Sequence, residues 1–475
     1  MPIKHYPLFT FHYHCQYLVL ILCLLLLGCN EENSSACLAP DYNRDGSLTI
    51  ESHIQCYTPQ NIHDAYRLNP IYQLGITGQK QHIILIDAYA SPSVKEDLIV
   101  FHHAYFPERA LPEINVKFPF GTPDYDDEDA PSWAIQSSVD SQWSHAIAPD
   151  ANITMIVALS DDSSDLLDAI HYAIDHASSG SVVSLTFSNA ETHYSDDDID
   201  AFEAAFKQGT DKGLNFFAPA GTWGSDNRTD AITAVYPASS PYVISVGGTF
   251  LQYAWSWDPL SNIPYLDSGD KNPDYFHINS NPMQRLESVW NAAWLTAATG
   301  GGISQIFDVP DWQQNVSHII DSNALNNAQI SGRGYPDLAW HAGFNGGLFT
   351  YYDGNWFVNA GTSMGSPQVT AFFALCHQYL SQQGFDNIGL YTPWLYQIED
   401  SHAYNDIIPI NQGSVLAGML INNQRFTLLD SGEVAFGDIE GYPTSVGWDL
   451  TTGFGSPNGI DFLMALEKII ASNQE

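Results

Sequence analysis

Short apolar runs alternate with stretches of helical pattern along most of the chain. The runs end in polar or glycine residues, as expected of strands that are buried on both faces of a parallel sheet. The expected strands are 82–89, 153–159, 181–187, 214–221 and 242–248. Helices are expected between them, at 135–148, 165–176 and 198–213. This alternation predicts an α/β fold, a doubly wound parallel sheet with flanking helices in one large domain. Functional groups should then lie at the carboxyl ends of the strands.

The first 28 residues have the pattern of an export signal and not of a folded element. Lys4 is weakly basic, and the apolar run from Tyr17 to Gly28 is too short for a comfortable membrane span. The run ends in LLGC, which resembles a bacterial lipobox. We therefore expect lipidation at Cys29 and an exported protein anchored in a bacterial cell envelope membrane. Ordinary signal cleavage, giving a secreted protein, and an uncleaved anchor remain the alternatives.

Residues 29–56 form a short segment with a possible calcium loop. In DYNRDGSLTIE, Asp41, Asn43, Asp45 and Gly46 occupy positions 1, 3, 5 and 6 of an EF-hand-type loop. Oxygen ligands alternate there, and the glycine permits the sharp turn. Position 12, where a bidentate acid is expected, holds Ser52. The segment is either a variant calcium loop or an acidic turn in a linker.

The charge balance excludes one class of partner. Lys and Arg number 15 against 54 Asp and Glu, a formal net charge of −39, whereas phosphate binding depends on basic residues. We therefore expect no nucleic-acid partner, and we expect a monomer. Such acidity suits an acid-tolerant exported protein, because protonation of carboxylates brings the molecule toward neutrality. A solubility role or calcium-rich surroundings are the alternatives. Hydrophobic residues make up 44% of the 475, enough for a substantial core.

The most specific chemical signal is GTSMGSP, residues 361–367. A Gly-Thr-Ser turn precedes Pro367, and an apolar helix pattern follows. Such a turn exposes Ser363 at a helix N-terminus, where backbone N–H groups and the helix dipole favour a developing anion. Proline suits the first helical turn because its nitrogen needs no partner there. The string predicts a nucleophilic serine.

The HGTH-like segment that carries the histidine of subtilisins does not occur in the sequence. The chain instead resembles the sedolisin family from Tyr57 to Asn458. The matching segments, in order, are TPQNIHDAYRL, IILIDAY, WSHAIAPDANI, YPASSPYVISVGGT, GGGIS, GRGYPDLAW, GTSMGSP and GWDLTTGFGSPNG. The resemblance implies a peptidase domain over 57–475, a subtilisin-like fold, and hydrolysis of peptide or protein substrates at acidic pH.

The resemblance also exposes a departure from the family's catalytic pattern. Sedolisins carry a Glu and an Asp four residues apart on one helix, ahead of an HAxAP segment, and this spacing puts both side chains on one face. The segment HAIAP at 145–149 aligns the Asp with Asp140 and the Glu with Gln136. A second family Asp, a donor to the oxyanion, aligns with Thr222 in APAGTWG. Glutamine cannot accept the serine proton, but a threonine hydroxyl can still donate a hydrogen bond.

A second calcium site is implied near the C-terminus, where NDI and SVGWD resemble the metal site of the family. By position, Asp406 and Asp449 would supply carboxylates, whereas Ile407, Ser445 and Gly447 would supply backbone carbonyls. Such an oxygen shell suits calcium.

Two functions follow. The first is an exported serine peptidase of sedolisin type with impaired or atypical catalysis, in which Ser363 is the nucleophile. The second is a calcium-binding surface lipoprotein without catalysis that uses the same fold to bind peptides or a protein partner.

Overall fold

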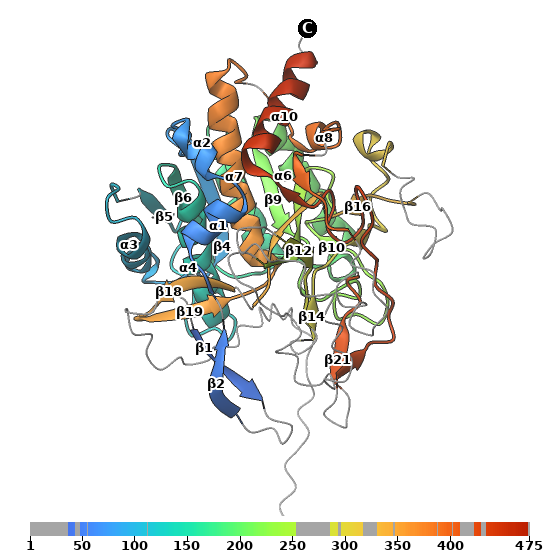
Figure 1. Cartoon of the computed structure of the whole chain (residues 1–475), viewed down its shortest axis with the longest axis horizontal. Helices are drawn as coiled ribbons and strands as arrows, with labels where there is room; N and C mark the ends of the chain where they lie inside the picture. The colour runs from blue at the N-terminus through green and yellow to red at the C-terminus, as the bar shows by residue number, and fades with distance from the viewer. Residues whose placement is uncertain are drawn as a thin grey trace, which may run out of the picture.

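The structure is a computed structural model, shown in Figure 1. It describes residues 37–42, 48–54, 56–111, 113–252, 286–292, 296–316, 330–344, 347–386, 388–400, 402–408, 422–428 and 434–473. The export signal at 1–28, the lipidation residue Cys29, and Asn43 and Asp45 of the possible calcium loop lie outside these ranges. Within them, no helix has the length and apolar character needed to cross a bilayer.

The expected parallel sheet is confirmed. The five expected strands are β4 (His82–Ala88), β6 (Asn152–Ala158), β7 (Val182–Leu185), β9 (Asn215–Pro219) and β11 (Val243–Gln252). Three further strands join them: β5 (Ile114–Lys117), β12 (Leu286–Val289) and β17 (Leu338–His341). The eight-stranded sheet has the order β12-β11-β9-β7-β4-β6-β5, with β17 also paired to β11. Its pairs are parallel except β11 with β12. β4 therefore lies inside the sheet, with β6 and β5 on one side and β7, β9 and β11 on the other, as in a doubly wound sheet.

The three expected helices are present as α4 (Ala130–Ile147), α5 (Ser163–His176) and α6 (Asp196–Asp211). α4 begins five residues before the expected start, because Pro131 is tolerated in a first helical turn. α6 begins with a capping box, in which Ser195 and Asp198 exchange hydrogen bonds. The other α-helices are α1 (Pro59–Ala65), α2 (Asn69–Gln73), α3 (Val94–Tyr105), α7 (Thr362–Gln382), α8 (Thr392–Leu395) and α10 (Gly459–Ser472).

Short strands surround the central sheet. A hairpin of β1 (Cys37–Tyr42) and β2 (Leu48–Ile54) precedes it, and β3 (Cys56–Tyr57) pairs with β18 (Gly347–Tyr352), which pairs with β19 (Asn355–Asn359). The remaining elements are β8 (Asn189–Ala190), β10 (Val235–Tyr236), β13 (Asn291–Ala292), β14 (Ala297–Ala298), β15 (Gly302–Ile303), β16 (Gly334–Tyr335), β20 (Tyr404–Asn405), β21 (Phe426–Leu428), β22 (Val434–Phe436), β23 (Ser456–Pro457) and the 3₁₀ turns η1 (Glu191–His193) and η5 (Asp311–Gln313).

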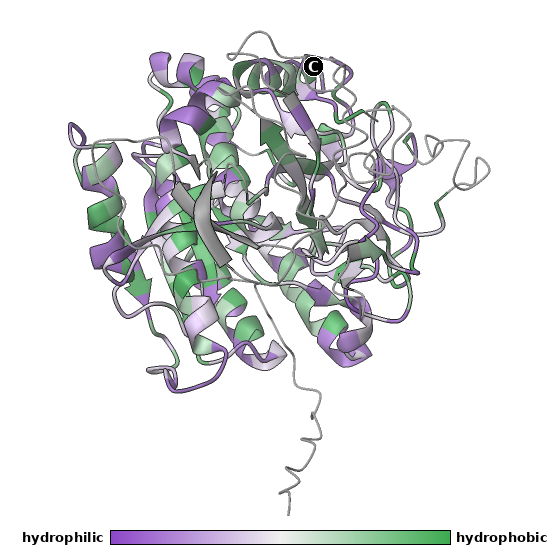
Figure 2. Cartoon of the chain, turned by 60° about the horizontal axis from the view of Figure 1, so that its bottom comes forward, coloured by the Kyte–Doolittle hydropathy of each residue, from purple (hydrophilic) through white to green (hydrophobic). Residues whose placement is uncertain are grey.

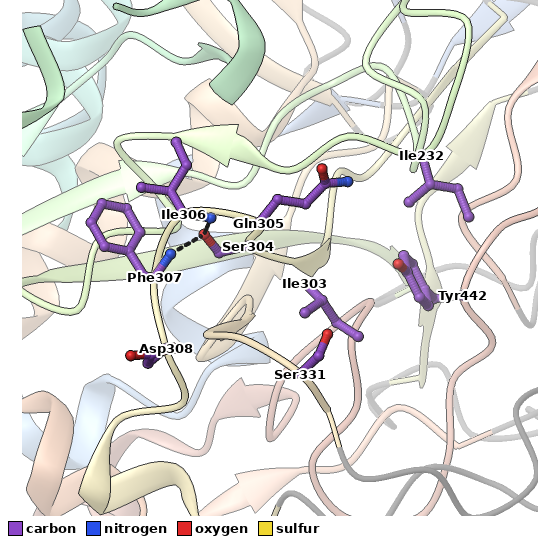
Figure 3. A pocket seen from close by; sticks show the side chains of 9 residues that line it. All are labelled: Ile232, Ile303, Ser304, Gln305, Ile306, Phe307, Asp308, Ser331 and Tyr442. Carbon is purple, nitrogen blue, oxygen red and sulfur yellow. Dashed lines mark hydrogen bonds between the residues drawn. The ribbon is translucent and has the colours of Figure 1, made fainter. Parts of the chain in front are cut away.

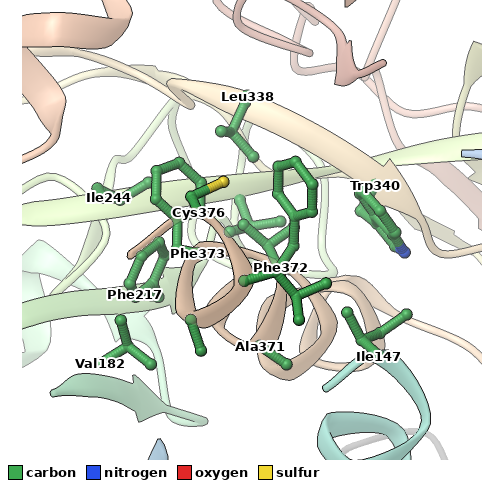
Figure 4. Close-up of a cluster of buried hydrophobic side chains, with 14 of the residues drawn as sticks. Ile147, Val182, Phe217, Ile244, Leu338, Trp340, Ala371, Phe372, Phe373 and Cys376 are labelled. Atoms are coloured by element: carbon green, nitrogen blue, oxygen red, sulfur yellow. The ribbon is translucent and has the colours of Figure 1, made fainter. Parts of the chain in front are cut away.

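The core on one face of the sheet is organised around α7, the long orange helix of Figure 1. Phe372 and Phe373 of this helix lie among Phe217 of β9 and Leu338 and Trp340 of β17, and all five side chains are fully buried (Figure 4). In Figure 2 the central strands are largely green, whereas the outer helices carry both colours. This pattern is that of a sheet buried on both faces. The packing holds the N-terminus of α7 at the carboxyl edge of the sheet.

Candidate active site

Ser363 is the second residue of α7 and is 8% exposed. Gly361, which caps the helix, has a φ of 123°, a conformation that L side chains rarely adopt. The glycine therefore permits the turn that brings the serine to the helix N-terminus. The first N–H groups of a helix have no partner within the helix and are available to an anion. Within the described residues, no ionisable side chain hydrogen-bonds to the Ser363 hydroxyl.

Gln136 lies beside the backbone of Ser363. Its side chain comes from α4, which packs against α7, and it is 2% exposed. The amide nitrogen Nε2 donates to Asp140 Oδ1 at 2.7 Å and to the carbonyl oxygen of Ser363 at 3.3 Å. The structure therefore brings Gln136, Asp140 and Ser363 together, with an amide next to the serine. This amide is bound to the main chain and not to the serine hydroxyl.

Asp140 is a fully buried carboxyl group within a hydrogen-bond network. Its Oδ2 accepts a hydrogen bond from the hydroxyl of Thr186, and its Oδ1 accepts the bond from Gln136. Burial raises the pKa of Asp140 to about 7, although these bonds oppose the shift. Asp87, at the end of β4, lies against it. Burial and then the Asp140 charge raise the pKa of Asp87 well above its ordinary value. The pair therefore holds at least one proton in acidic solution.

Thr222 reaches the same place from β9. A Cβ built on Gly361 would lie 3.5 Å from both the Thr222 hydroxyl and the Ser363 hydroxyl, so both face this turn. The Thr222 hydroxyl is also 3.4 Å from that of Thr362. Gly300, in the GGGIS segment, lets this segment approach the backbone just before Thr222, because a side chain on Gly300 would collide with the carbonyl oxygen of Ala220. The Thr222 hydroxyl thus lies at the same turn as the Ser363 hydroxyl.

Two neighbours of Asp140 were not assigned to the site from the sequence. Asp87 is the sixth residue of β4, and Thr186 directly follows β7. Both therefore lie at the carboxyl ends of adjacent parallel strands, where functional groups gather in such sheets. That rule could have found them, but it does not say which strand ends are adjacent.

The described surface contains a pocket of about 400 Å³, shown in Figure 3. It is lined by Ile232, Ile303, Ser304, Gln305, Ile306, Phe307, Asp308, Ser331 and Tyr442. The hydroxyl of Ser304 accepts hydrogen bonds from the N–H groups of Ile306 and Phe307 and so shapes its wall. None of the catalytic candidates lines this pocket, and we assign it no role.

The predicted C-terminal calcium ligands gather around one loop. Asp406 Oδ2 accepts from Gly447 N at 2.8 Å, and Asp449 Oδ2 accepts from Ser445 N at 2.9 Å. Asp406 Oδ1 is buried without a hydrogen-bond partner, and burial raises the pKa of Asp449 to about 7. A buried carboxylate oxygen without a partner is costly unless a cation compensates it. No three His, Cys, Asp or Glu side chains converge in the described ranges, so a cation would also need backbone carbonyls.

The N-terminal calcium prediction stays untested. The backbone of β1 and β2 forms an antiparallel hairpin in which Asp41 pairs with Thr49. The residues between these strands, including Asn43 and Asp45, lie outside the described ranges.

Comparison with known proteins identifies homologous peptidases. Kumamolisin of Bacillus sp. (strain MN-32) is 29% identical over 414 residues, covering 86% of this chain and 63% of kumamolisin. Tripeptidyl-peptidase 1 of Canis lupus familiaris is 26% identical over 265 residues, covering 52% of this chain and 36% of that relative. The chain therefore spans less than two thirds of the length of these relatives. No family model matches it.

A solved structure supports the fold. Pseudomonas sedolisin, a serine-carboxyl proteinase complexed with two molecules of pseudo-iodotyrostatin, superposes with a TM-score of 0.65. The two share 21% sequence identity, and the match covers 89% of this chain and 100% of the sedolisin chain. This match shows the subtilisin-like fold, and the ordered motifs and homologous sequences support a relationship to the sedolisin family.

Proposed function

We propose that the protein is a serine peptidase whose catalysis is impaired by the loss of its general base. One observation carries this proposal: an amide, Gln136 Nε2, lies 3.3 Å from the Ser363 carbonyl oxygen, in the place where the family pattern expects a carboxyl group. Homology to peptidases supports the substrate class, peptides or proteins.

The proposed reaction begins with attack of Ser363 Oγ on the carbonyl carbon of a peptide bond. An Oγ–C bond forms, the C=O π electrons move onto the oxygen to give an oxyanion, and the hydroxyl proton passes to solvent water. When the oxyanion collapses, the peptide C–N bond breaks and the leaving amine takes a proton from water. Gln136 cannot accept this proton, and the loss of a positioned base typically slows such a step by ~10²–10⁴. Among the described residues, the Gln136 amide joins Asp140 to the serine backbone. Removal of the serine proton is therefore the step that we expect to be slow.

Stabilisation of the oxyanion does not need the missing carboxylate. The Thr222 hydroxyl and the free N–H groups at the start of α7 face the nucleophile turn. One well-aimed donor of this kind is worth roughly 10²–10³ in rate. Unlike a carboxyl group, a threonine hydroxyl donates without being protonated first. We propose that Thr222 and the helix N-terminus stabilise the tetrahedral intermediate, and that binding and this donation account for the remaining activity.

The first test is an assay of peptide cleavage between pH 3 and 7 with the native protein and Ser363→Ala. We expect slow turnover that Ser363→Ala abolishes, because Ser363 is the proposed nucleophile. A fluorophosphonate label should react with the native protein and not with the variant. Turnover unaffected by Ser363→Ala would refute the assignment.

The alternative, a protein that binds peptides without cleaving them, is favoured by the position of Gln136. Its amide bridges Asp140 and the main chain of the serine turn, a purely structural role. Peptide binding without turnover in the native protein would favour this second function.

We further propose that calcium binds at the C-terminal loop, held by the carboxylates of Asp406 and Asp449 and by the carbonyls of Ile407, Ser445 and Gly447. The buried, unpartnered Asp406 Oδ1 supports a cation at this place. The ion would supply positive charge to the buried carboxyl group of Asp449 and the half-buried one of Asp406, and would stabilise the native state, which alone binds it.

Removal of calcium is expected to lower the melting temperature. At a hundredfold excess over Kd, calcium should contribute ~2.7 kcal/mol to the free energy of unfolding. Thermal unfolding with calcium, with magnesium and with EDTA measures this effect. Asp406→Asn should remove the response, whereas Asp126→Asn, at an exposed carboxylate, should keep it. A response that survives Asp406→Asn but disappears in Asp45→Asn would assign the ion to the N-terminal loop instead.

A further inference from the structure

A stacked cation lies next to the oxyanion donor. The guanidinium carbon of Arg228 is 3.3 Å from the centre of the Trp223 ring, and Trp223 directly follows Thr222. Arg228 is exposed and Trp223 is half-buried. Only 15 Lys and Arg occur in a chain of net charge −39, so an arginine beside the proposed oxyanion donor is a candidate for a functional role.

The neighbouring acid is already paired with another arginine. Arg425 Nε donates to both oxygens of Asp226, at 3.0 and 3.2 Å, and the backbone N–H of Arg228 donates to Asp226 Oδ1 at 2.7 Å. The guanidinium of Arg228 donates to no residue in the described part of the chain. Its hydrogen-bond donors are therefore available to a ligand.

The Trp223 ring belongs to a small apolar cluster at the nucleophile turn. It packs against the buried group formed by Trp290, Ala292, Ala297 and Ala342. The carbonyl oxygen of Ala342 accepts from Gly361 N at 2.8 Å. A Cβ on Gly248 would lie 2.9 Å from Ala342 and 3.1 Å from Thr362. The cluster thus flanks the turn that holds Ser363, and the stacked pair lies at its exposed edge.

An arginine held flat on an aromatic ring is a preorganised receptor for a planar anion. Stacking fixes the plane of the guanidinium, whose paired N–H donors match the two oxygens of a carboxylate. Partial burial against its neighbours, and then the charge of Arg425, lower the pKa of Arg228 to about 10, so it stays protonated at neutral and acidic pH. Carboxylates are the anions that a peptide itself supplies.

We propose that Arg228, stacked on Trp223, is a specificity-determining residue that binds a carboxylate of the peptide beside the scissile bond. The inference rests on the proposed peptide site of Ser363. The carboxylate comes either from an Asp or Glu side chain or from the free C-terminus of the peptide, and both have the same chemistry.

The test measures peptide binding to full-length Ser363→Ala at pH 6.5, where peptide carboxylates are ionised. Three otherwise identical peptides distinguish the sources: one with an internal Glu and an amidated end, one with Gln and a free C-terminus, and one with Gln and an amidated end. We expect one of the first two to bind roughly tenfold to a hundredfold more tightly than the third, because paired charge-assisted hydrogen bonds are strong.

Arg228→Gln in the same background should remove this preference while the uncharged peptide binds as before, and Arg228→Lys should restore only part of it. Arg67→Gln, which removes the same charge from a surface ion pair with Asp461, should change nothing. A preference that persists in Arg228→Gln, or equal binding of all three peptides, would overturn the subsite alone. If no peptide binds, the peptide site fails, and the subsite fails with it.

Discussion

Replacing Gln136 with glutamate is expected to raise peptide turnover at acidic pH by ~10²–10⁴. The new carboxylate would stand next to Ser363, in the place where the amide now bonds the Ser363 carbonyl oxygen. Two oxygens repel each other, so the carboxylate should turn from this carbonyl toward the serine hydroxyl. Asp140 would keep it in position by sharing a proton, since Asp140 Oδ1 now lies 2.7 Å from the side-chain nitrogen. Steady-state cleavage of a fluorogenic peptide from pH 3 to 7 measures the gain.

Two control variants test whether the gain in turnover comes from a base that acts through Ser363. The double variant Gln136→Glu/Ser363→Ala should be inactive, because the gained base acts only through the serine. Gln60→Glu, which adds the same charge at an exposed position of α1, should leave turnover unchanged. A folded Gln136→Glu variant with no gain would show that the α4 face does not supply the base position, and the diagnosis of a missing base would be wrong.

Replacing Asp140 with asparagine is expected to stabilise the protein at pH 8 and to change its stability little at pH 3. Asparagine has the same shape and can keep a hydrogen bond to Gln136, but it carries no charge. Burial raises the pKa of Asp140 from its ordinary value of 3.8 to about 7. A group whose pKa is higher in the folded state than in the unfolded state stabilises the folded protein when it is protonated. For Asp140 this contribution is fully present below pH 3.8 and is lost as pH rises through about 7. The variant should avoid this loss, on the order of 2–4 kcal/mol.

The measurement is the difference in free energy of unfolding between variant and native protein, from urea titrations at pH 3 and pH 8. Groups that do not interact with Asp140 shape each curve but cancel in this difference, whereas Asp87, whose pKa is raised by burial and then by the Asp140 charge, contributes to it. Burial raises the pKa of Glu203 to about 7, whereas it lowers the pKa of His63 to about 4 and of His145 to about 3. Asp126→Asn, at an exposed position, serves as the control and should leave stability unchanged at both pH values. Destabilisation of Asp140→Asn at pH 8 would mean that Asp140 is ionised and needed in the native network.

The sequence alone determined the features that depend on neighbours along the chain. Apolar runs bounded by glycine and polar residues predict buried strands, and the turn before α7 can be recognised because only glycine adopts the φ found at Gly361. The four-residue spacing of Gln136 and Asp140 places both on one helix face. These features follow from hydrogen bonds and sterics within one or two turns of chain. Resemblance to a family then identified Gln136 as the position where we propose that a catalytic carboxyl group is missing.

The tertiary structure decided which of these local features meet. Gln136 and Ser363 are 227 residues apart, and they touch because α4 and α7 pack on the same sheet. Asp87 and Thr186 reach Asp140 because β4 and β7 are neighbours in the sheet, although β5 and β6 lie between them in sequence. Arg425 pairs with Asp226 across 199 residues and so leaves Arg228 available to a ligand. Local pattern does not encode such adjacency, because strand order and helix packing arise from burial summed over the whole core.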